Sequence, residues 1–260
     1  MTLKHQGPKK RFMFRITLHA FTVIVLTLLT QIGGLAWIVA LFFRWRLLAF
    51  TLIYVTLSAL TVWIAPQFGR VAVSCLDDGP LQVQGWMYCA LNRTYVTPEM
   101  AQVLQDTANE MNNRFPGTTT LLLDGNFPFV TGFPLLPHRS HDDGKKADLA
   151  FYYRDGKGGY LPGQTRSPIG YFAFEDGPTQ CEPTWPSLRW DLNGLQPLWR
   201  SYALDVERTR LAVQTLARDP RVDKIFVEPH LVDHLQLSHP KIRFQGCRAA
   251  RHDDHIHFQL

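Results

Sequence analysis

The residues best suited to chemistry lie in two clusters that are far apart in the sequence. Residues 137–148 carry two histidines and an aspartate whose spacing suits metal binding, and residues 252–257, within the last nine residues, carry three more histidines. Two imidazoles and one carboxylate suit a single divalent metal ion, because catalytic zinc sites combine three protein ligands with an open fourth position. The residues with metal-ligating side chains are His138, His141, Asp148, His252, Asp253, Asp254, His255 and His257.

The C-terminal cluster is expected to lie on a strand over residues 255–260. Side chains two apart in a strand point to the same face. His255 and His257 therefore project together, while Ile256 and Phe258 face the core. A metal ion on His257 would have His255 as its immediate neighbour.

The upstream cluster combines a loop and a strand. Asp148 is expected near the start of a central strand over residues 147–153, and His141 precedes it across a turn at Gly144. Mixed nitrogen and oxygen ligands suit zinc. Zinc lowers the pKa of its bound water toward about 7, so the site also needs a group that moves protons.

Four side chains are candidates for work beside the metal. His255 is the first candidate for proton transfer, since it shares a face with the ligand His257, and His252 and Asp254 are alternatives. His138 is expected at the rim, in contact with substrate. Each cluster alone has an ordinary explanation, as a surface loop with a strand-capping acid or as histidines at a sheet edge. Their joint occurrence favours a metal site.

The two clusters also carry a family resemblance. The segment Pro137-His138-Arg139-Ser140-His141-x-x-Gly144-x-x-x-Asp148 and the ending His252-Asp253-Asp254-His255-Ile256-His257 resemble the penicillin-insensitive murein endopeptidases. These belong to a wider group of zinc DD-peptidases that includes D-alanyl-D-alanine carboxypeptidases and the hedgehog signalling domain. The resemblance implies that His141, Asp148 and His257 bind zinc and that the substrate is a D-alanyl peptide bond of peptidoglycan. It also implies a small α+β domain with a central antiparallel sheet.

The chain departs from that family in two respects. Charged residues (Asp142-Asp143 and Lys145-Lys146) surround the glycine of the first motif, and two apolar segments precede the domain, unlike in the soluble endopeptidases. These differences bear on the substrate more than on the metal.

The elements expected to position the site lie in residues 71–260, which are enough for one domain. Few helices and irregularly alternating strands indicate an α+β fold with a mostly antiparallel sheet. Thr97-Pro98-Glu99 begins a helix, with a hydroxyl cap and proline at the first helical position. The expected helices span residues 98–115, 205–218 and 229–237, and the expected strands span 118–123, 147–153, 169–174, 224–228 and 255–260.

The N-terminal quarter indicates a membrane anchor. After a basic tail over residues 1–15, the anchor (16–68) contains two nearly uncharged apolar runs, residues 21–43 and 47–65, each near the ~20 residues that cross a bilayer as a helix. Gly33-Gly34 is expected to allow close helix approach. The 27 Lys+Arg exceed the 22 Asp+Glu partly because of this tail, which suits anionic lipid head groups. Nothing resembles a nucleic-acid-binding stripe.

Two signals conflict on which side of the membrane the domain faces. Lys and Arg cluster before the first run, which favours a cytoplasmic N-terminus, and two spans would then leave the domain cytoplasmic as well. The four cysteines, Cys75, Cys89, Cys181 and Cys247, all follow the anchor and suit two disulfides in an oxidising compartment. Cys75–Cys89 and Cys181–Cys247 are the expected pairs, from proximity in sequence, among three possible connectivities.

The leading hypothesis is a zinc peptidase in the inner membrane that acts on peptidoglycan or its peptides from the periplasm. A non-catalytic, zinc-stabilised module that binds cell wall or protein is one alternative. A cytoplasm-facing D,D-dipeptidase is another. The sequence carries no signal for an oligomeric state.

Overall fold

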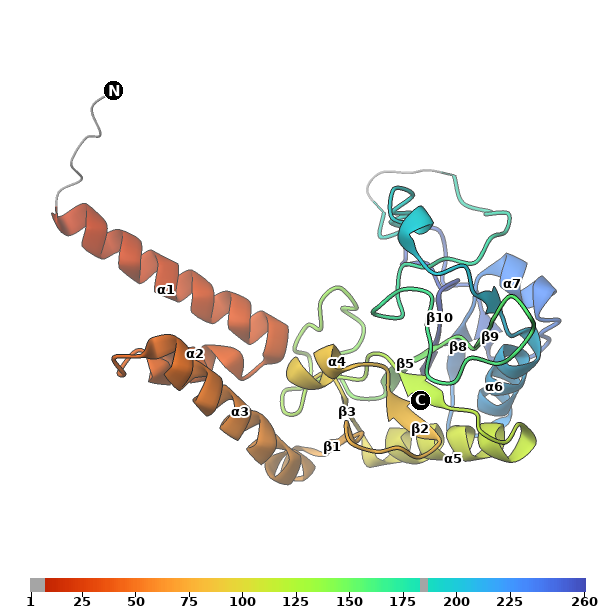
Figure 1. The fold of residues 1–260 in the computed structure, drawn as a ribbon, viewed down its shortest axis with the longest axis horizontal. Helices are drawn as coiled ribbons and strands as arrows, with labels where there is room; N and C mark the ends of the chain where they lie inside the picture. The colour runs from red at the N-terminus through yellow and green to blue at the C-terminus, as the bar shows by residue number, and fades with distance from the viewer. Residues whose placement is uncertain (1–7, 183–186) are drawn as a thin grey trace.

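The computed structural model describes residues 8–182 and 187–260 (Figure 1). Three helices and a short 3-10 helix precede a mixed α/β domain. The N-terminal elements are α1 Pro8–Thr30, α2 Gly33–Ala40, α3 Arg46–Ile64 and η1 Ala65–Phe68. The helices of the domain are α4 Trp86–Ala90, α5 Pro98–Arg114, η2 Gln196–Leu198, α6 Val206–Arg218 and α7 Pro229–His234. Its strands are β1 Val71–Ala72, β2 Leu81–Val83, β3 Tyr95–Val96, β4 Thr120–Leu122, β5 Lys146–Ala150, β6 Tyr153–Arg154, β7 Ala203–Leu204, β8 Lys224–Phe226, β9 Ile242–Arg243 and β10 His255–Gln259.

The first apolar run is not one continuous helix. α1 ends at Thr30, and Gln31 adopts a left-handed backbone conformation with φ 66°. The chain then folds back as α2, which packs on α1. A Cβ on Gly33 would lie 2.6 Å from Thr30 Oγ1 and one on Gly34 only 1.9 Å from Thr27 Oγ1, so the glycines permit this close packing. The expected single span over residues 21–43 is therefore wrong, because the first long apolar helix covers residues 10–30 and residues 33–40 form the separate helix α2, whereas the expected break before the second run is present.

The second long apolar helix, residues 46–68, agrees with the expected run 47–65. Both α1 and α3 direct their C-terminal ends toward the domain (Figure 1). Next to the end of α1, the Gln31 Oε1 atom accepts a hydrogen bond of 2.9 Å from the Phe129 N–H. Thr61 near the end of α3 hydrogen-bonds to Tyr95 of the domain. The two long helices thus run in the same direction, with α2 as the return segment.

The domain is built on a six-stranded sheet in the order β2-β4-β5-β10-β8-β9. Its centre is antiparallel, but β2 pairs with β4 and β8 with β9 in parallel. The sheet is therefore mixed, with the expected antiparallel pairing at its centre and a parallel pair at each edge. The expected strand over 169–174 does not form, because Gly170 (φ 80°) and Phe172 (φ 64°) interrupt an extended backbone.

One face of the sheet is covered by α5 and α6. Thr97 and Asp205 cap these helices through side-chain oxygens that accept the N–H of Met100 and Arg208, as the sequence predicts for Thr97. The apolar stripes of both helices join Ile256 and Phe258 in the main core. The opposite face is covered by loops, and it is this face that carries the histidines of β10.

Candidate metal centre

Asp148 is at the middle of the site and is completely buried. It lies on β5 directly opposite His257 of β10 in the antiparallel register. The Asp148 Oδ1 atom lies 2.8 Å from His257 Nδ1 and 3.3 Å from His141 Nε2. The third side of this triangle, from His141 Nε2 to His257 Nδ1, is 3.2 Å. Donor atoms at 2.0–2.1 Å around a tetrahedral ion would be about 3.3 Å apart, so the triangle has the size of one ligand face.

The tautomer of His141 favours a cation in this triangle. The His141 Nδ1 atom lies 2.9 Å from the Gly125 carbonyl oxygen, which can only accept, so Nδ1 carries the proton. In a neutral ring, Nε2 then offers a lone pair toward the Asp148 carboxylate, which also only accepts. Two acceptors this close require a proton or a metal ion between them. A backbone carbonyl that fixes the outer nitrogen of a histidine is typical of metal ligands.

Gly125 can hold His141 because the backbone passes very close to a neighbouring segment. A Cβ at this position would lie 2.9 Å from the Tyr95 carbonyl oxygen and 2.9 Å from Val96 Cγ1. Its N–H donates to Arg93 O over 2.9 Å. Any larger residue would displace the carbonyl that orients the ring of His141.

The second oxygen of Asp148 faces a different set of groups. Tyr171 donates its hydroxyl proton to Asp148 Oδ2 over 2.6 Å, and His138 Nδ1 and His255 Nε2 lie 3.3 and 3.7 Å from the same oxygen. One carboxylate is thus shared by ligand candidates on one side and by groups of the cleft wall on the other.

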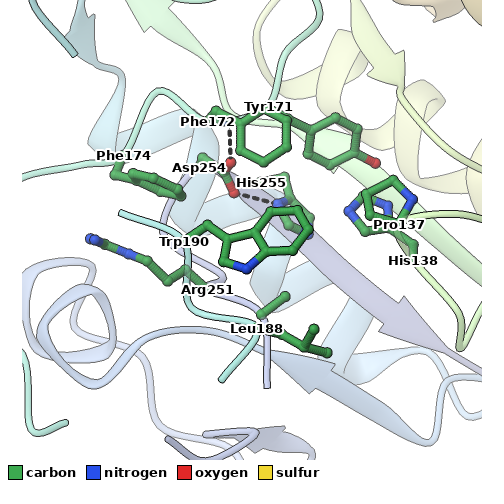
Figure 2. A pocket seen from close by; sticks show the side chains of 11 residues that line it. Pro137, His138, Tyr171, Phe172, Phe174, Leu188, Trp190, Arg251, Asp254 and His255 are labelled. Atoms are coloured by element: carbon green, nitrogen blue, oxygen red, sulfur yellow. Dashed lines mark hydrogen bonds and ion pairs between the residues drawn. The ribbon is translucent and has the colours of Figure 1, made fainter. Parts of the chain in front are cut away.

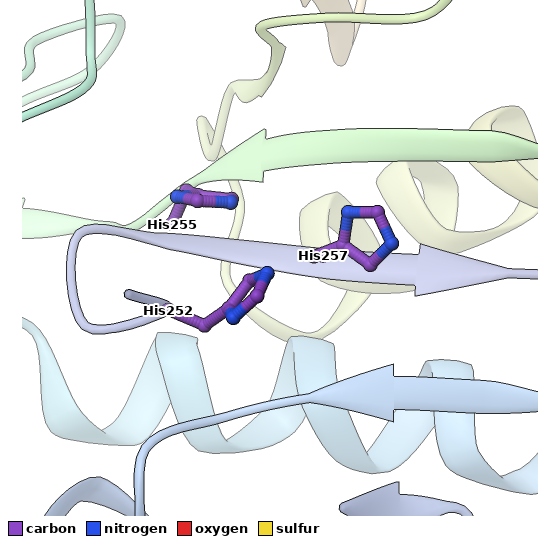
Figure 3. Close-up of side chains that lie close together, drawn as sticks. All are labelled: His252, His255 and His257. Atoms are coloured by element: carbon purple, nitrogen blue, oxygen red, sulfur yellow. The ribbon is translucent and has the colours of Figure 1, made fainter. Parts of the chain in front are cut away.

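The C-terminal histidines gather on the loop-covered face of the sheet. His252, His255 and His257 are each nearly fully buried, and one nitrogen from each lies within 4.8 Å of the others (Figure 3). His138, His141 and Asp148 form a second such group. Asp254 accepts a hydrogen bond from His255 Nδ1, which directs the other ring nitrogen, Nε2, toward Asp148. Six of the seven candidate residues therefore line one cleft, with His138 at its edge, and the seventh, Asp254, contacts it through His255.

The charges of the cluster are tightly coupled. Burial opposes ionisation of Asp148, but His141, His255 and His257 hold the pKa of its carboxyl well below its usual range. Burial likewise opposes the imidazolium of His141, and the Asp148 carboxylate outweighs it and raises the pKa. Burial dominates at His257 and lowers its pKa to about 4, with Asp148 only partly compensating.

The pKa values of His255, on β10, and of His252, just before β10, are also shifted in opposite directions. At His255 the favourable charges of Asp148 and then Asp254 outweigh burial and raise the pKa to about 9. At His252 burial and the neighbouring His255 lower the pKa well below its usual value. Without a metal ion, His255 therefore carries positive charge at neutral pH, while His252 and His257 stay neutral.

A buried ion pair below the site was not foreseen from the sequence. Arg93 donates through Nε and Nη2 to both carboxylate oxygens of Asp124, at 2.6 and 2.7 Å. Asp124 Oδ2 also lies 3.0 Å from His138 Nδ1. Burial alone would raise the pKa of Asp124, but Arg93 more than offsets it and holds the pKa at about 2. The Asp124-Gly125 pair reads as a strand-ending turn in the sequence, so nothing local marks it as part of the site.

The site opens into a cleft of about 560 Å³ lined by both clusters. Loop residues Leu188, Gln245, Ala249 and Ala250 form its outer wall. The cleft leaves the triangle of Asp148, His141 and His257 accessible from one side, so the residues can hold a metal ion with a free coordination position. No protein-family model and no curated protein matches the chain, and the interpretation of the site rests on its geometry.

Proposed function

We propose that the chain is a membrane-anchored, zinc-dependent peptidase whose substrates are D-alanyl peptide bonds of peptidoglycan peptides. The observation that carries the proposal is the triangle of donor atoms from His141, Asp148 and His257 at the base of an open cleft. The resemblance of the two motifs to murein endopeptidases supplies the substrate class.

Zinc is the metal that these donors fit best. Two neutral imidazoles and one carboxylate with an open fourth position are a common ligand set of catalytic zinc. The hard cations magnesium and calcium prefer sites made of oxygen alone. A zinc ion held here would polarise a substrate carbonyl and lower the pKa of a bound water toward about 7.

Two histidines beside the donor triangle, His252 and His255, are suited to transfer protons. Two titratable neighbours whose pKa values are pushed apart are suited to opposite roles. His252, which stays neutral, is suited to accept a proton from water. His255, which is held cationic between Asp148 and Asp254, is suited to donate a proton to the leaving amine. Charge from a bound dication would reduce the effect of Asp148 on His255 and bring the pKa of its imidazolium closer to neutrality.

Asp254, Tyr171 and His138 keep these groups in place. Asp254 fixes His255 through Nδ1, and the Tyr171 hydroxyl holds the second oxygen of Asp148. His138, whose side chain is 15% exposed, stands where the cleft meets solvent and is suited to contact the substrate. Asp254 acts through His255 and is a positioning residue in this scheme.

The arrangement of the anchor supports an inner-membrane protein with its domain in the periplasm. The basic residues Lys9, Lys10 and Arg11 lie at the start of α1 and Arg46 begins α3, and both of these ends point away from the domain (Figure 1). The positive-inside tendency places that end in the cytoplasm. Because α1 and α3 run in the same direction, the domain then lies on the opposite side, where its disulfides Cys75–Cys89 and Cys181–Cys247 are stable. A return of the chain through α2 would reconcile the basic tail with the cysteines.

The test is a direct measurement of metal and of hydrolysis. The full-length protein, purified in lipid nanodiscs, is expected to hold about one zinc ion per chain and to release peptide fragments from purified sacculi. His257→Ala should abolish both, and His234→Ala, at an exposed histidine outside the cleft, should change neither. Bound zinc without any turnover would favour the binding-module alternative, and unchanged zinc in His257→Ala would refute the assigned ligands.

A further inference from the structure

A second cavity opens directly beside the metal centre and is mostly apolar (Figure 2). It encloses about 520 Å³ and shares Pro137, His138, Leu188, Ala250 and His255 with the cleft. Its remaining walls are Tyr171, Phe172, Phe174, Trp190, Arg251 and Asp254. A substrate held in the cleft therefore has an aromatic cavity on one flank.

Phe172, which forms one wall of the cavity, has an unusual backbone conformation. Its φ of 64° lies in the left-handed region, which residues with large side chains rarely adopt. The backbone is fixed from both sides: its N–H donates to Asp254, and its carbonyl oxygen accepts from Gln196 Nε2 and Trp199 Nε1, each at 2.8 Å. A strained conformation so well supported is typical of functional positions.

The opposite wall comes from the segment 187–200. Leu188 and Trp190 are large apolar side chains that stay 53% and 48% exposed. Between them, Arg189 points the other way and forms two hydrogen bonds to Glu228, at 3.0 and 2.9 Å. This alternation presents the two apolar neighbours of Arg189 to the cavity. The Cys181–Cys247 disulfide ties the chain on either side of this wall.

The polar side chains Asp254 and Arg251, in the part of the cavity not shared with the cleft, already have partners. Both oxygens of Asp254 are taken, one by the Phe172 N–H and the other by His255. Arg251 lies over the Phe174 ring at 4.0 Å and pairs with Asp253 and Asp191. A polar or charged group entering the cavity would lose water without gaining a partner, whereas an apolar group would gain by leaving water.

From these contacts we infer that the cavity binds an apolar side chain, larger than the methyl group of alanine, on the residue next to the bond that is cut. The inference rests on the proposed peptidase function: D-alanine stands on one side of the cut bond, and the apolar side chain belongs to the residue on the other side. Asp254 joins the cavity to the proton-transfer group, since it bonds Phe172 with one oxygen and His255 with the other (Figure 2). A side chain seated against Phe172 is thereby held at a fixed offset from His255 and from the metal centre. Phe172 and Trp190 are the specificity-determining residues.

The test compares blocked tripeptides with alanine, serine, leucine or phenylalanine at each position. Binding is measured by calorimetry to the metal-free, full-length protein in nanodiscs, and hydrolysis by the zinc-loaded protein. Leucine or phenylalanine at one position is expected to bind about 10- to 100-fold more tightly than alanine, in line with the selectivity of apolar pockets for added methylene groups. Serine should bind no better than alanine.

Two variants test the walls without disturbing the metal. Phe172→Gly removes the ring and suits the positive φ, and Trp190→Ala opens the other side. Both should lose the preference for leucine or phenylalanine while retaining zinc. Trp86→Ala, at a tryptophan 81% exposed elsewhere on the domain, should behave as the unmodified protein.

The outcomes separate the two proposals. Equal binding of the alanine and phenylalanine peptides, or an unchanged preference in Phe172→Gly, would overturn the cavity assignment even if hydrolysis proceeds. Selective binding that the variants abolish would support the cavity assignment, and zinc-loaded protein that binds selectively but never hydrolyses any peptide would overturn only the proposed peptidase function.

Discussion

His257 and Asp148 face each other as register partners on neighbouring antiparallel strands, with Nδ1 and Oδ1 2.8 Å apart. The pair is therefore fixed by the hydrogen bonding of β5 with β10 and not by flexible loops. Only His141 comes to the triangle from a loop, and its ring is oriented by the Gly125 carbonyl. A site with two of three donors on a central sheet is rigid enough to bind a metal ion without rearrangement.

Removing the shared carboxylate should weaken metal binding strongly. Asp148→Asn leaves the volume almost unchanged but removes the carboxylate charge that contacts both His141 and His257. Zinc affinity is expected to fall by more than the roughly 10- to 100-fold typical of losing an outer partner. Competition with a chelating dye measures the affinity, and His234→Ala is the control. Wild-type affinity in Asp148→Asn would contradict the assigned ligand set.

His252, His255 and His257 form an alternative ligand group. Two variants distinguish this group from the proposed ligands by whether they retain zinc. If His252 and His255 move protons, His252→Ala and His255→Ala should keep zinc and lower kcat by about 10²- to 10⁴-fold. If they are ligands, both variants should lose zinc together with activity. Metal content and kcat measured on the same preparations distinguish the two, and loss of zinc would reassign the centre to the C-terminal cluster.

Much of the site could be predicted because most of its residues lie in two short segments of the sequence. The alternation of polar and apolar residues over 255–258 placed His255 and His257 on one face and Ile256 in the core, as observed. Both disulfides also pair as expected from proximity along the chain. These features depend on local spacing, which a sequence displays directly.

Other features depend on contacts between distant residues and could not be foreseen. Arg93 meets Asp124 only after the strands assemble, and neither residue carries a local signal of its partner. The return at Gln31 lies inside a run without charged residues, where isolated polar residues and glycines also fit an uninterrupted membrane helix. The irregular path at Phe172 contradicts an aromatic composition that is typical of strands.

The Arg93–Asp124 pair makes a prediction about stability. Arg93→Met should destabilise the domain by about 3 to 5 kcal/mol, because it leaves a buried carboxylate without its partner. Urea unfolding in mild detergent at neutral pH measures the effect, and Arg139→Met, at an exposed arginine, is the control.

The Arg93–Asp124 pair also predicts how the stability of the domain depends on pH. The folded pKa of Asp124 is about 2, below its ordinary value of 3.8, so its contribution is complete above pH 3.8 and is lost as the pH falls through 2. The destabilisation by Arg93→Met should therefore shrink in that acidic window. A constant difference from neutral pH to pH 2 would show that Asp124 is not the group that Arg93 stabilises.

The parallel course of α1 and α3 predicts that the two ends of the chain lie on opposite sides of the membrane. Protease added to intact spheroplasts should digest the C-terminal domain and spare an epitope tag placed before Met1. Permeabilised cells, in which both are digested, are the control. Digestion of tag and domain together in intact cells, or protection of both, would mean that α2 does not return the chain across the membrane.

The Cys181–Cys247 disulfide closes a separation of 66 residues, whereas Cys75–Cys89 closes one of 14. Chain-entropy arguments assign them about 4 and about 3 kcal/mol of stabilisation, respectively. Replacing either pair by serine should lower the free energy of unfolding by the amount given for that pair. Their effects on function should differ. Only Cys181–Cys247 flanks the wall formed by Leu188 and Trp190. Its loss should therefore also weaken binding of phenylalanine-containing tripeptides and leave zinc affinity intact. Calorimetry on both double-serine variants makes the comparison, and equal binding in the two would show that the disulfide stabilises the domain without shaping the cavity.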